Sequence, residues 1–240
     1  MAEGFAKQGA SLALLARRVE RLEDSAKDFQ KKYGVDVLPV KCDVTDDESV
    51  ASAIVVIKEH FGHAEVLVND AGGEKGTGTP ALDYKFEDWD FTLKLDLTSI
   101  LRLCKAFGKF MQEGMAAKKQ EYGRIINSAS IYGMVGNTTI PSLAYHTSKG
   151  AVANFTRALA AELGPTGITV NAICPGFFYT ELTEVALNSD FFQEMAKRSV
   201  PMQRYGKSGE LNSAALFLAD EASSYVTGVI LPVDGGYTCI

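Results

Sequence analysis

The chain has 240 residues, of which 46% are hydrophobic and 22% charged, a composition typical of a globular protein that buries a large core. Its formal net charge of -6 argues against nucleic acid as a partner, because nucleic-acid binders usually carry a basic patch. The sequence has no apolar run of transmembrane length and no signal-peptide pattern at its start, so we expect a cytoplasmic protein without a membrane partner.

The elements expected in chain order alternate between strands and helices. Residues 1–8 have apolar side chains at helical spacing, and Gly9 ends that segment. Strands are expected at 11–16, 35–40, 64–69, 123–130, 168–176 and 228–236, and helices at 18–34, 46–61, 86–115, 145–163 and 210–220. Residues 177–205 are expected to be mostly loop. This alternation predicts an α/β fold, with a mostly parallel sheet covered on both faces in one domain over 1–240.

The sharpest chemical signal is a tyrosine followed by a lysine in the predicted helix 145–163. Tyr145 and Lys149 are four residues apart and therefore point the same way. A nearby ammonium can lower the pKa of a phenol by about 1–3 units, which would make Tyr145 a usable proton donor and acceptor. The alternative is a tyrosine and a lysine on a solvated helix face.

Polar residues and glycines also follow the predicted strands, where α/β proteins build their sites. Ser130 could hydrogen-bond a substrate carbonyl, although it could be an ordinary turn serine, and Ser128 competes with it. The glycines of "NDAGG" at 69–73 would let a ligand approach the backbone. Asp43 ends another strand and could instead cap the next helix near Thr45. The four cysteines and three histidines are scattered without ligand spacing, so we expect reduced thiols and no metal site.

Together these motifs resemble the short-chain dehydrogenase/reductase family. The similarity covers nearly the whole chain in the family's order: Y-x-x-x-K at 145–149, Ser130 in S-x-x-G, "NDAG" at 69–72, Asp43, and "PG" at 175–176. Its gluconate 5-dehydrogenase-like and 3-oxoacyl carrier-protein reductase-like members look most similar. The resemblance implies a Rossmann-type doubly wound sheet, a nicotinamide cofactor and assembly into homotetramers or homodimers.

The resemblance also implies residue roles. Tyr145 would exchange a proton with the substrate, Lys149 would assist it and hold the nicotinamide ribose, and Ser130 would orient the carbonyl. The remaining cofactor contacts fall on Asp43 and Val44 for the adenine, on Asn69, Ala71 and Gly72 along the adenosine ribose, and on Pro175, Gly176, Phe178 and Thr180 around the nicotinamide.

Three features depart from the family pattern. Asp70 replaces the second asparagine of the family's "NNAG". Asp96 stands where the family often has an asparagine that holds a water in the proton relay, and an ionised carboxylate cannot donate a hydrogen bond. The family's first strand and Gly-rich turn are not found, and residues 1–10 look like the end of the helix after that turn. We therefore expect an N-terminally incomplete sheet, with a strand upstream that belongs between 11–16 and 64–69, or else a phosphate cradle at 72–80.

Cofactor choice depends on the end of the strand 11–16. Ala16 replaces the carboxylate that binds the ribose of NAD, and Arg17 and Arg18 follow it, which favours NADP(H) over NAD(H). Residues 177–206 would form a lid over a small secondary alcohol or ketone, with sugar acids among the candidates, and contain Arg198 and Arg204. The apolar residues expected between subunits are Met111, Met115, Phe155 and Leu159. The alternative to an enzyme is a catalytically silent binding or assembly subunit, suggested by Asp70, Asp96 and the missing turn.

Overall fold

The computed structural model describes residues 1–137, 140–180 and 183–240, and its strands form two parallel sheets. β1 (Leu12–Ala16) pairs with β2 (Val37–Lys41). The larger sheet has the order β3 (Val66–Asn69), β4 (Gly123–Ser128), β5 (Ile168–Pro175) and β6 (Ile230–Val233). These are the six expected strands with bounds shifted by a few residues, so the predicted α/β fold is confirmed.

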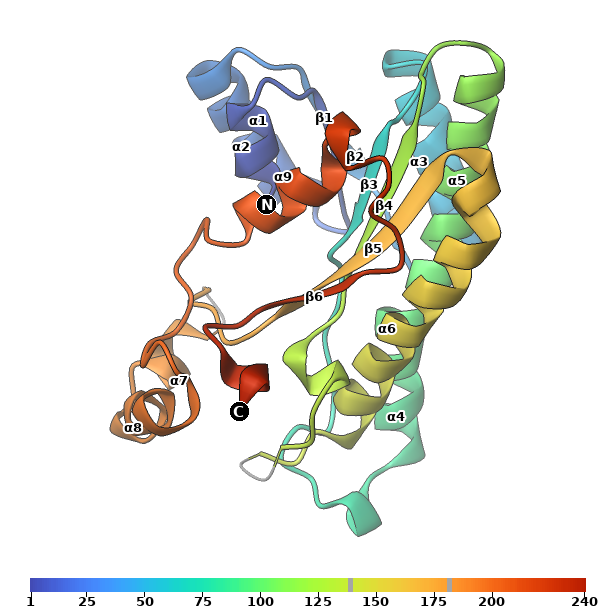
Figure 1. Ribbon diagram of the computed structural model, residues 1–240. Helices are drawn as coiled ribbons and strands as arrows, with labels where there is room; N and C mark the ends of the chain where they lie inside the picture. Colours follow the sequence, from blue (N-terminus) through green and yellow to red (C-terminus); the bar gives the residue numbers. More distant parts are fainter. Residues whose placement is uncertain (138–139, 181–182) are drawn as a thin grey trace.

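Helices cover both sides of the larger sheet (Figure 1). α3 (Asp47–His60), α5 (Ser99–Ala116) and α6 (Leu143–Leu163) lie on one side, and α1 (Ala2–Lys7) and α9 (Asn212–Ala219) on the other, with α2 (Val19–Tyr33) packed against β2. Side chains alternate between the two faces of a strand. In β4, accordingly, Ile125 packs in the core under α5 and α6, while Ile126 packs with Leu218 of α9.

The predicted helix 86–115 is one run with an irregular centre. It consists of α4 (Phe86–Leu93), a π-helical turn (Lys94–Thr98) and α5. Met111 is 0% exposed in the core, so its expected place between subunits is wrong: α5 turns this side chain toward the sheet. Met115, Phe155 and Leu159 are partly buried against the same core.

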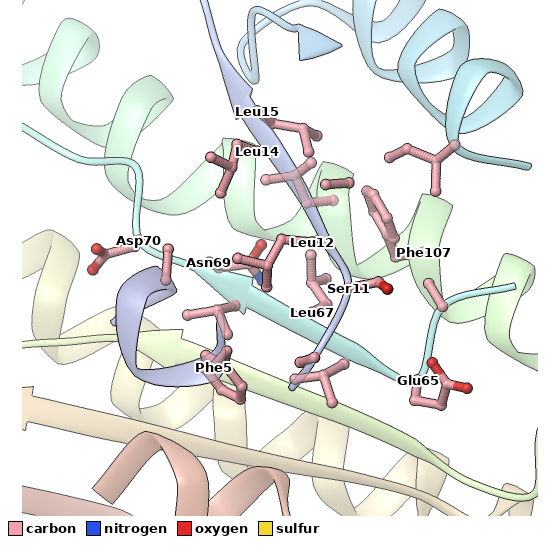
Figure 2. A pocket seen from close by; sticks show the side chains of 18 of the residues that line it. Phe5, Ser11, Leu12, Leu14, Leu15, Glu65, Leu67, Asn69, Asp70 and Phe107 are labelled. Carbon is pink, nitrogen blue, oxygen red and sulfur yellow. The ribbon is translucent and has the colours of Figure 1, made fainter. Parts of the chain in front are cut away.

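A groove separates the two sheets. A cavity of about 670 Å³ lies between β1 and β3 and is lined by apolar side chains of both strands. Figure 2 shows Leu12, Leu14 and Leu15 of β1 beside Leu67 of β3, with Phe5 and Phe107 from flanking helices. The interruption lies between the strands where the incomplete sheet was expected.

Two helices interrupt the segment expected to be loop. α7 (Glu184–Leu187) and α8 (Asp190–Ser199) lie together in Figure 1, and residues 181–182 of the expected lid are outside the described ranges. Phe192, Met195 and Ala196 of α8 pack into a cluster with Tyr205, so apolar spacing of three and four residues stabilises this helix. Along the described chain, no helix is long and apolar enough to cross a membrane.

Candidate active site

Tyr145 and Lys149 project from the first two turns of α6 toward the end of β4. The ammonium nitrogen of Lys149 lies 5.4 Å from the ring centroid of Tyr145 and donates a hydrogen bond of 2.9 Å to the carbonyl oxygen of Ser128. The lysine is 4% exposed. The reading of these two residues as a solvated helix face is therefore wrong.

Ser130 joins them from the turn after β4. Its hydroxyl oxygen accepts a hydrogen bond from the backbone N–H of Tyr132, as a turn serine does, and its side chain also hydrogen-bonds that of Tyr145. The serine, tyrosine and lysine line one cavity of about 280 Å³ together with Asp70, Gly72, Gly73, Ser128, Ala129, Pro175 and Gly176. Four segments far apart in sequence thus converge where the carboxyl ends of the strands meet.

Gly133 makes this convergence possible. A Cβ atom on Gly133 would lie 2.5 Å from the backbone carbonyl group of Lys149, so any other residue would push the turn after Ser130 away from α6. In the sequence this glycine is only the last position of S-x-x-G. Its packing role depends on how closely α6 approaches, which the sequence alone does not show.

Asp96 lies beneath the cavity in the π-helical turn and is 0% exposed. Its Oδ1 accepts from the backbone N–H of Gly73 at 2.8 Å, and its Oδ2 accepts from the hydroxyl of Ser148 at 3.1 Å. Oδ2 is also 3.8 Å from the ammonium of Lys149. The carboxylate therefore links the loop after β3 to α6.

The electrostatics differ from the expectation for Tyr145. Burial, assisted by the negative charges of Asp96, Glu74 and Asp70, raises the pKa of Tyr145 to about 12, against the lowering effect of the Ser130 hydrogen bond. Burial also lowers the pKa of Lys149, while Asp96 opposes that change. The expected lowering of the phenol pKa by Lys149 is absent because desolvation of the phenolate outweighs it.

Residues expected around the nicotinamide divide into two groups. Pro175 and Gly176 line the cavity. Phe178 instead packs against Gly206, where a Cβ atom would lie 2.4 Å from its ring, and the exposed Thr180 forms a hydroxyl hydrogen bond with Thr183. The structure does not bring these last two side chains into the cavity.

The residues expected near the adenosine lie at the ends of β1, β2 and β3. Arg17 and Arg18 are exposed after β1. The pairing of Ala16 with Lys41 brings the ends of β1 and β2 to one edge. At this edge hydrogen bonds from Thr45, with a smaller contribution from the charge of Arg17, lower the pKa of Asp43. The Asp43 carboxylate accepts from both the N–H and the hydroxyl of Thr45, while Asp46 caps α3.

Other members of the expected adenosine set lie at the groove between the sheets. The amide nitrogen of Asn69 donates to Asn127 and Cys104 in the interior. Val44, Asn69 and Ala71 also line the groove between β1 and β3.

Residues 72–80 are the alternative phosphate cradle. Several backbone N–H groups of this segment are already engaged: Gly73 with Asp96, Lys75 with Thr92, and Gly78 with the carbonyl of Pro141. These bonds leave fewer donors for a phosphate. Gly72 and Gly73 line the cavity that holds Tyr145.

The cavity fits the nicotinamide and ribose half of a dinucleotide. A Cβ atom on Gly72 would lie 3.3 Å from the Lys149 ammonium and 3.1 Å from Asp96 Oδ1, so the glycine leaves room for these two groups beside the cavity. A buried ammonium and a phenol at the floor of such a cavity are donors suited to ribose hydroxyls.

Comparisons with known proteins find relatives along nearly the whole chain. A family profile described as Enoyl-(Acyl carrier protein) reductase matches residues 1–238. The gluconate 5-dehydrogenase of Gluconobacter oxydans is 30% identical over 238 residues, covering 99% of this chain and 89% of the relative.

Two solved structures extend the comparison. A short-chain type dehydrogenase/reductase from Mycobacterium marinum has a TM-score of 0.90 and 31% identity, with 100% of this chain and 90% of that chain covered. An NADPH-dependent 3-quinuclidinone reductase from Rhodotorula rubra has a TM-score of 0.88 and 32% identity, with 100% and 86% covered.

Proposed function

The chain belongs to the short-chain dehydrogenase/reductase family of oxidoreductases, and we propose that it transfers a hydride between NADP(H) and a secondary alcohol or ketone. The observation that carries the proposal is the convergence of Ser130, Tyr145 and Lys149 on one cavity. The silent-subunit alternative has no comparable support, because nothing about a binding role requires these three groups to meet.

In the proposed reaction, Ser130 donates a hydrogen bond to the substrate oxygen and stabilises the negative charge that develops there. Tyr145 donates its proton to that oxygen in reduction and accepts one in oxidation. Lys149 holds the ribose hydroxyls, and Asp96 keeps the lysine in place. When bound, the nicotinamide supplies or accepts the hydride.

The preference for NADP(H) rests on residues at the carboxyl end of β1. Ala16 cannot repel a 2′-phosphate, and the exposed Arg17 beside Asp43 can pair with one. Gly72 and Gly176 would border the nicotinamide half. Asp43, Val44 and Ala71 would border the adenosine.

Further parts of the proposal concern the whole protein. We propose one domain over residues 1–240, a small-molecule substrate, assembly as a homotetramer or homodimer, and a cytoplasmic location. The gluconate 5-dehydrogenase relative keeps a sugar acid among the substrates to be tested.

The test is NADPH-dependent reduction of a panel of ketones, followed by absorbance, with Tyr145→Phe as the variant. Removing the phenolic proton should abolish reduction and leave the affinity for NADPH, measured by calorimetry, nearly unchanged. Tyr225→Phe is the matched control because Tyr225 is fully exposed. Normal turnover in Tyr145→Phe would refute the proposed chemistry.

A further inference from the structure

The catalytic phenol stands beside a wall of aromatic rings. The ring of Tyr132 meets that of Tyr145 edge to face at 6.3 Å and that of Phe177 at 5.9 Å. Phe177 in turn contacts Tyr205 at 5.5 Å and Tyr237 at 5.9 Å between centroids. Tyr132 also stacks on the ring of His146 at 4.3 Å between centroids. The side of Tyr145 that faces Tyr132 is therefore aromatic.

A carboxylate lies on the same side as these rings. Oε2 of Glu74 accepts a hydrogen bond of 2.7 Å from the hydroxyl of Ser142, the buried residue that precedes α6. Ser142 is three residues before Tyr145, so this bond holds the Glu74 side chain close to the catalytic turn. Burial raises the pKa of both Tyr132 and Tyr145, and the negative charge of Glu74 adds to that rise at each phenol.

Both arginines of the expected lid are paired with carboxylates. Arg204 makes two hydrogen bonds of 2.8 Å with the two carboxylate oxygens of Glu210, and Arg198 lies 3.0 Å from Glu194. The Lys75 ammonium lies over the ring of Phe91 at 4.3 Å.

The ammonium of Lys149 donates to Ser128 and lies 3.8 Å from Asp96, and in the proposed function its remaining donor serves the ribose, not the substrate. Among the residues that the structure describes, the acidic groups at the site are Asp70, Glu74 and Asp96. An anionic substrate would therefore face a net negative site.

We infer, granted the proposed oxidoreductase function, that the site selects ketones bearing a cationic nitrogen over ketones bearing a carboxylate, with Glu74 as the residue that sets this preference. Aromatic rings attract a cation through their negative faces, and a partly desolvated carboxylate strengthens that attraction. A ketone that carries a carboxylate at the same position is repelled by the negative charge of Glu74. The inference narrows the substrate class and assigns Glu74 a role outside proton transfer.

Three ketones of one shape test the inference. Cyclohexanone is substituted opposite its carbonyl with trimethylammonium, with tert-butyl as the uncharged group of equal size, or with carboxylate. We expect kcat/KM with NADPH to be about 10-fold higher for the ammonium than for the tert-butyl ketone, and about 100-fold higher than for the carboxylate.

Glu74→Gln separates the charge from the hydrogen bond, because the amide oxygen still accepts from Ser142. The variant should lower the ratio of kcat/KM for the ammonium ketone to that for the carboxylate ketone by about 10-fold or more. Glu87→Gln removes an equal charge from an exposed position in the first turn of α4 and should leave the ratio unchanged.

The outcomes distinguish this inference from the proposed function. The tert-butyl ketone could be reduced while kcat/KM does not rank ammonium above tert-butyl above carboxylate, or the ammonium-to-carboxylate ratio could be unchanged in Glu74→Gln. Either result overturns the inference and leaves the oxidoreductase proposal intact. If none of the ketones is reduced, the proposed function fails in this assay. Calorimetry with trimethylammonium-cyclohexane and cyclohexanecarboxylate then decides the inference separately: tighter, Glu74-dependent binding of the ammonium supports it, and equal binding overturns it.

Discussion

The ammonium nitrogen of Lys149 lies 3.8 Å from Oδ2 of Asp96, and their side chains are 5% and 0% exposed. A buried charge is costly unless another charge or a set of hydrogen bonds compensates it. Here Ser128, Ser148 and Gly73 supply those hydrogen bonds. The pair therefore stands at the centre of the candidate site and joins α6 to the loop after β3.

Asp96→Asn should move the alkaline loss of NADPH affinity to lower pH. The amide oxygen can still accept from Gly73, but the charge that opposes the lowered pKa of Lys149 is gone. The lysine then loses its proton at lower pH than in the native protein, and its hold on the ribose weakens from that pH upward. Calorimetric titration with NADPH across the alkaline range measures the shift.

A matched control for this prediction is Asp70→Asn. Asp70 is exposed, and solvent screens its influence on the lysine, so its effect should be smaller. Identical pH profiles for Asp96→Asn and the native protein would contradict the argument.

The pKa of about 12 for Tyr145 predicts different pH profiles in the two directions. Reduction needs the protonated phenol, which persists throughout the neutral and mildly alkaline range. Oxidation needs the phenolate, whose fraction rises about 10-fold for each pH unit below the pKa. Steady-state kcat/KM should be flat for the ketone and rise steadily for the alcohol, and a plateau in oxidation near neutral pH would show that a bound cofactor lowers the phenol pKa substantially.

Ser130→Ala should lower turnover by about 100-fold, the effect typical of removing one hydrogen-bond donor from a developing oxyanion. Ser128→Ala provides the control, because Ser128 uses its backbone carbonyl, not its hydroxyl, to hold Lys149. Single-turnover reduction with saturating NADPH measures both. Loss of turnover in Ser128→Ala but not in Ser130→Ala would exchange their roles.

Arg17→Ala should reduce the preference for NADPH over NADH. A charge-assisted hydrogen bond to the 2′-phosphate contributes about 1.5–3 kcal/mol, which corresponds to about 10- to 150-fold in affinity. The ratio of the two dissociation constants is the readout, with Arg18→Ala tested in parallel and the exposed Lys27→Ala as a control for general charge. A native protein that binds both cofactors equally would mean that Arg17 contacts only solvent.

Much of this architecture follows from the sequence because it depends on local patterns. Apolar runs identified the strands, and the four-residue spacing of Tyr145 and Lys149 identified their shared direction on α6. Strand ends located Ser130 and Gly176 because parallel strands bring their carboxyl ends to one edge. The interruption between β1 and β3 was likewise expected from the order of motifs.

The features that the sequence did not predict depend on contacts between distant segments. The pKa of Tyr145 depends on how deeply other elements bury it, and the need for Gly133 depends on how closely α6 approaches. An apolar residue such as Met111 suits either the core or a contact between subunits. Only the orientation of α5 against the sheet shows that Met111 belongs to the core. The Glu74 hydrogen bond to Ser142 joins residues 68 positions apart, beyond any local pattern.

The protein should associate through exposed apolar side chains on α4 and α5. The buried Met111 cannot form part of this contact. Phe86 is 83% exposed and Leu101 is 52% exposed, and water contact with such large side chains is unfavourable. We expect a solution mass about four times the 25.9 kDa of one chain, measured by light scattering. Leu101→Glu should lower that mass, because each copy would bury an unpaired carboxylate at the contact. Leu82→Glu is the control: Leu82 is fully exposed in the short 3-10 helix before α4, and its substitution should leave the mass unchanged. A native mass equal to one chain would refute association, and an oligomer insensitive to Leu101→Glu would place the contact on another face.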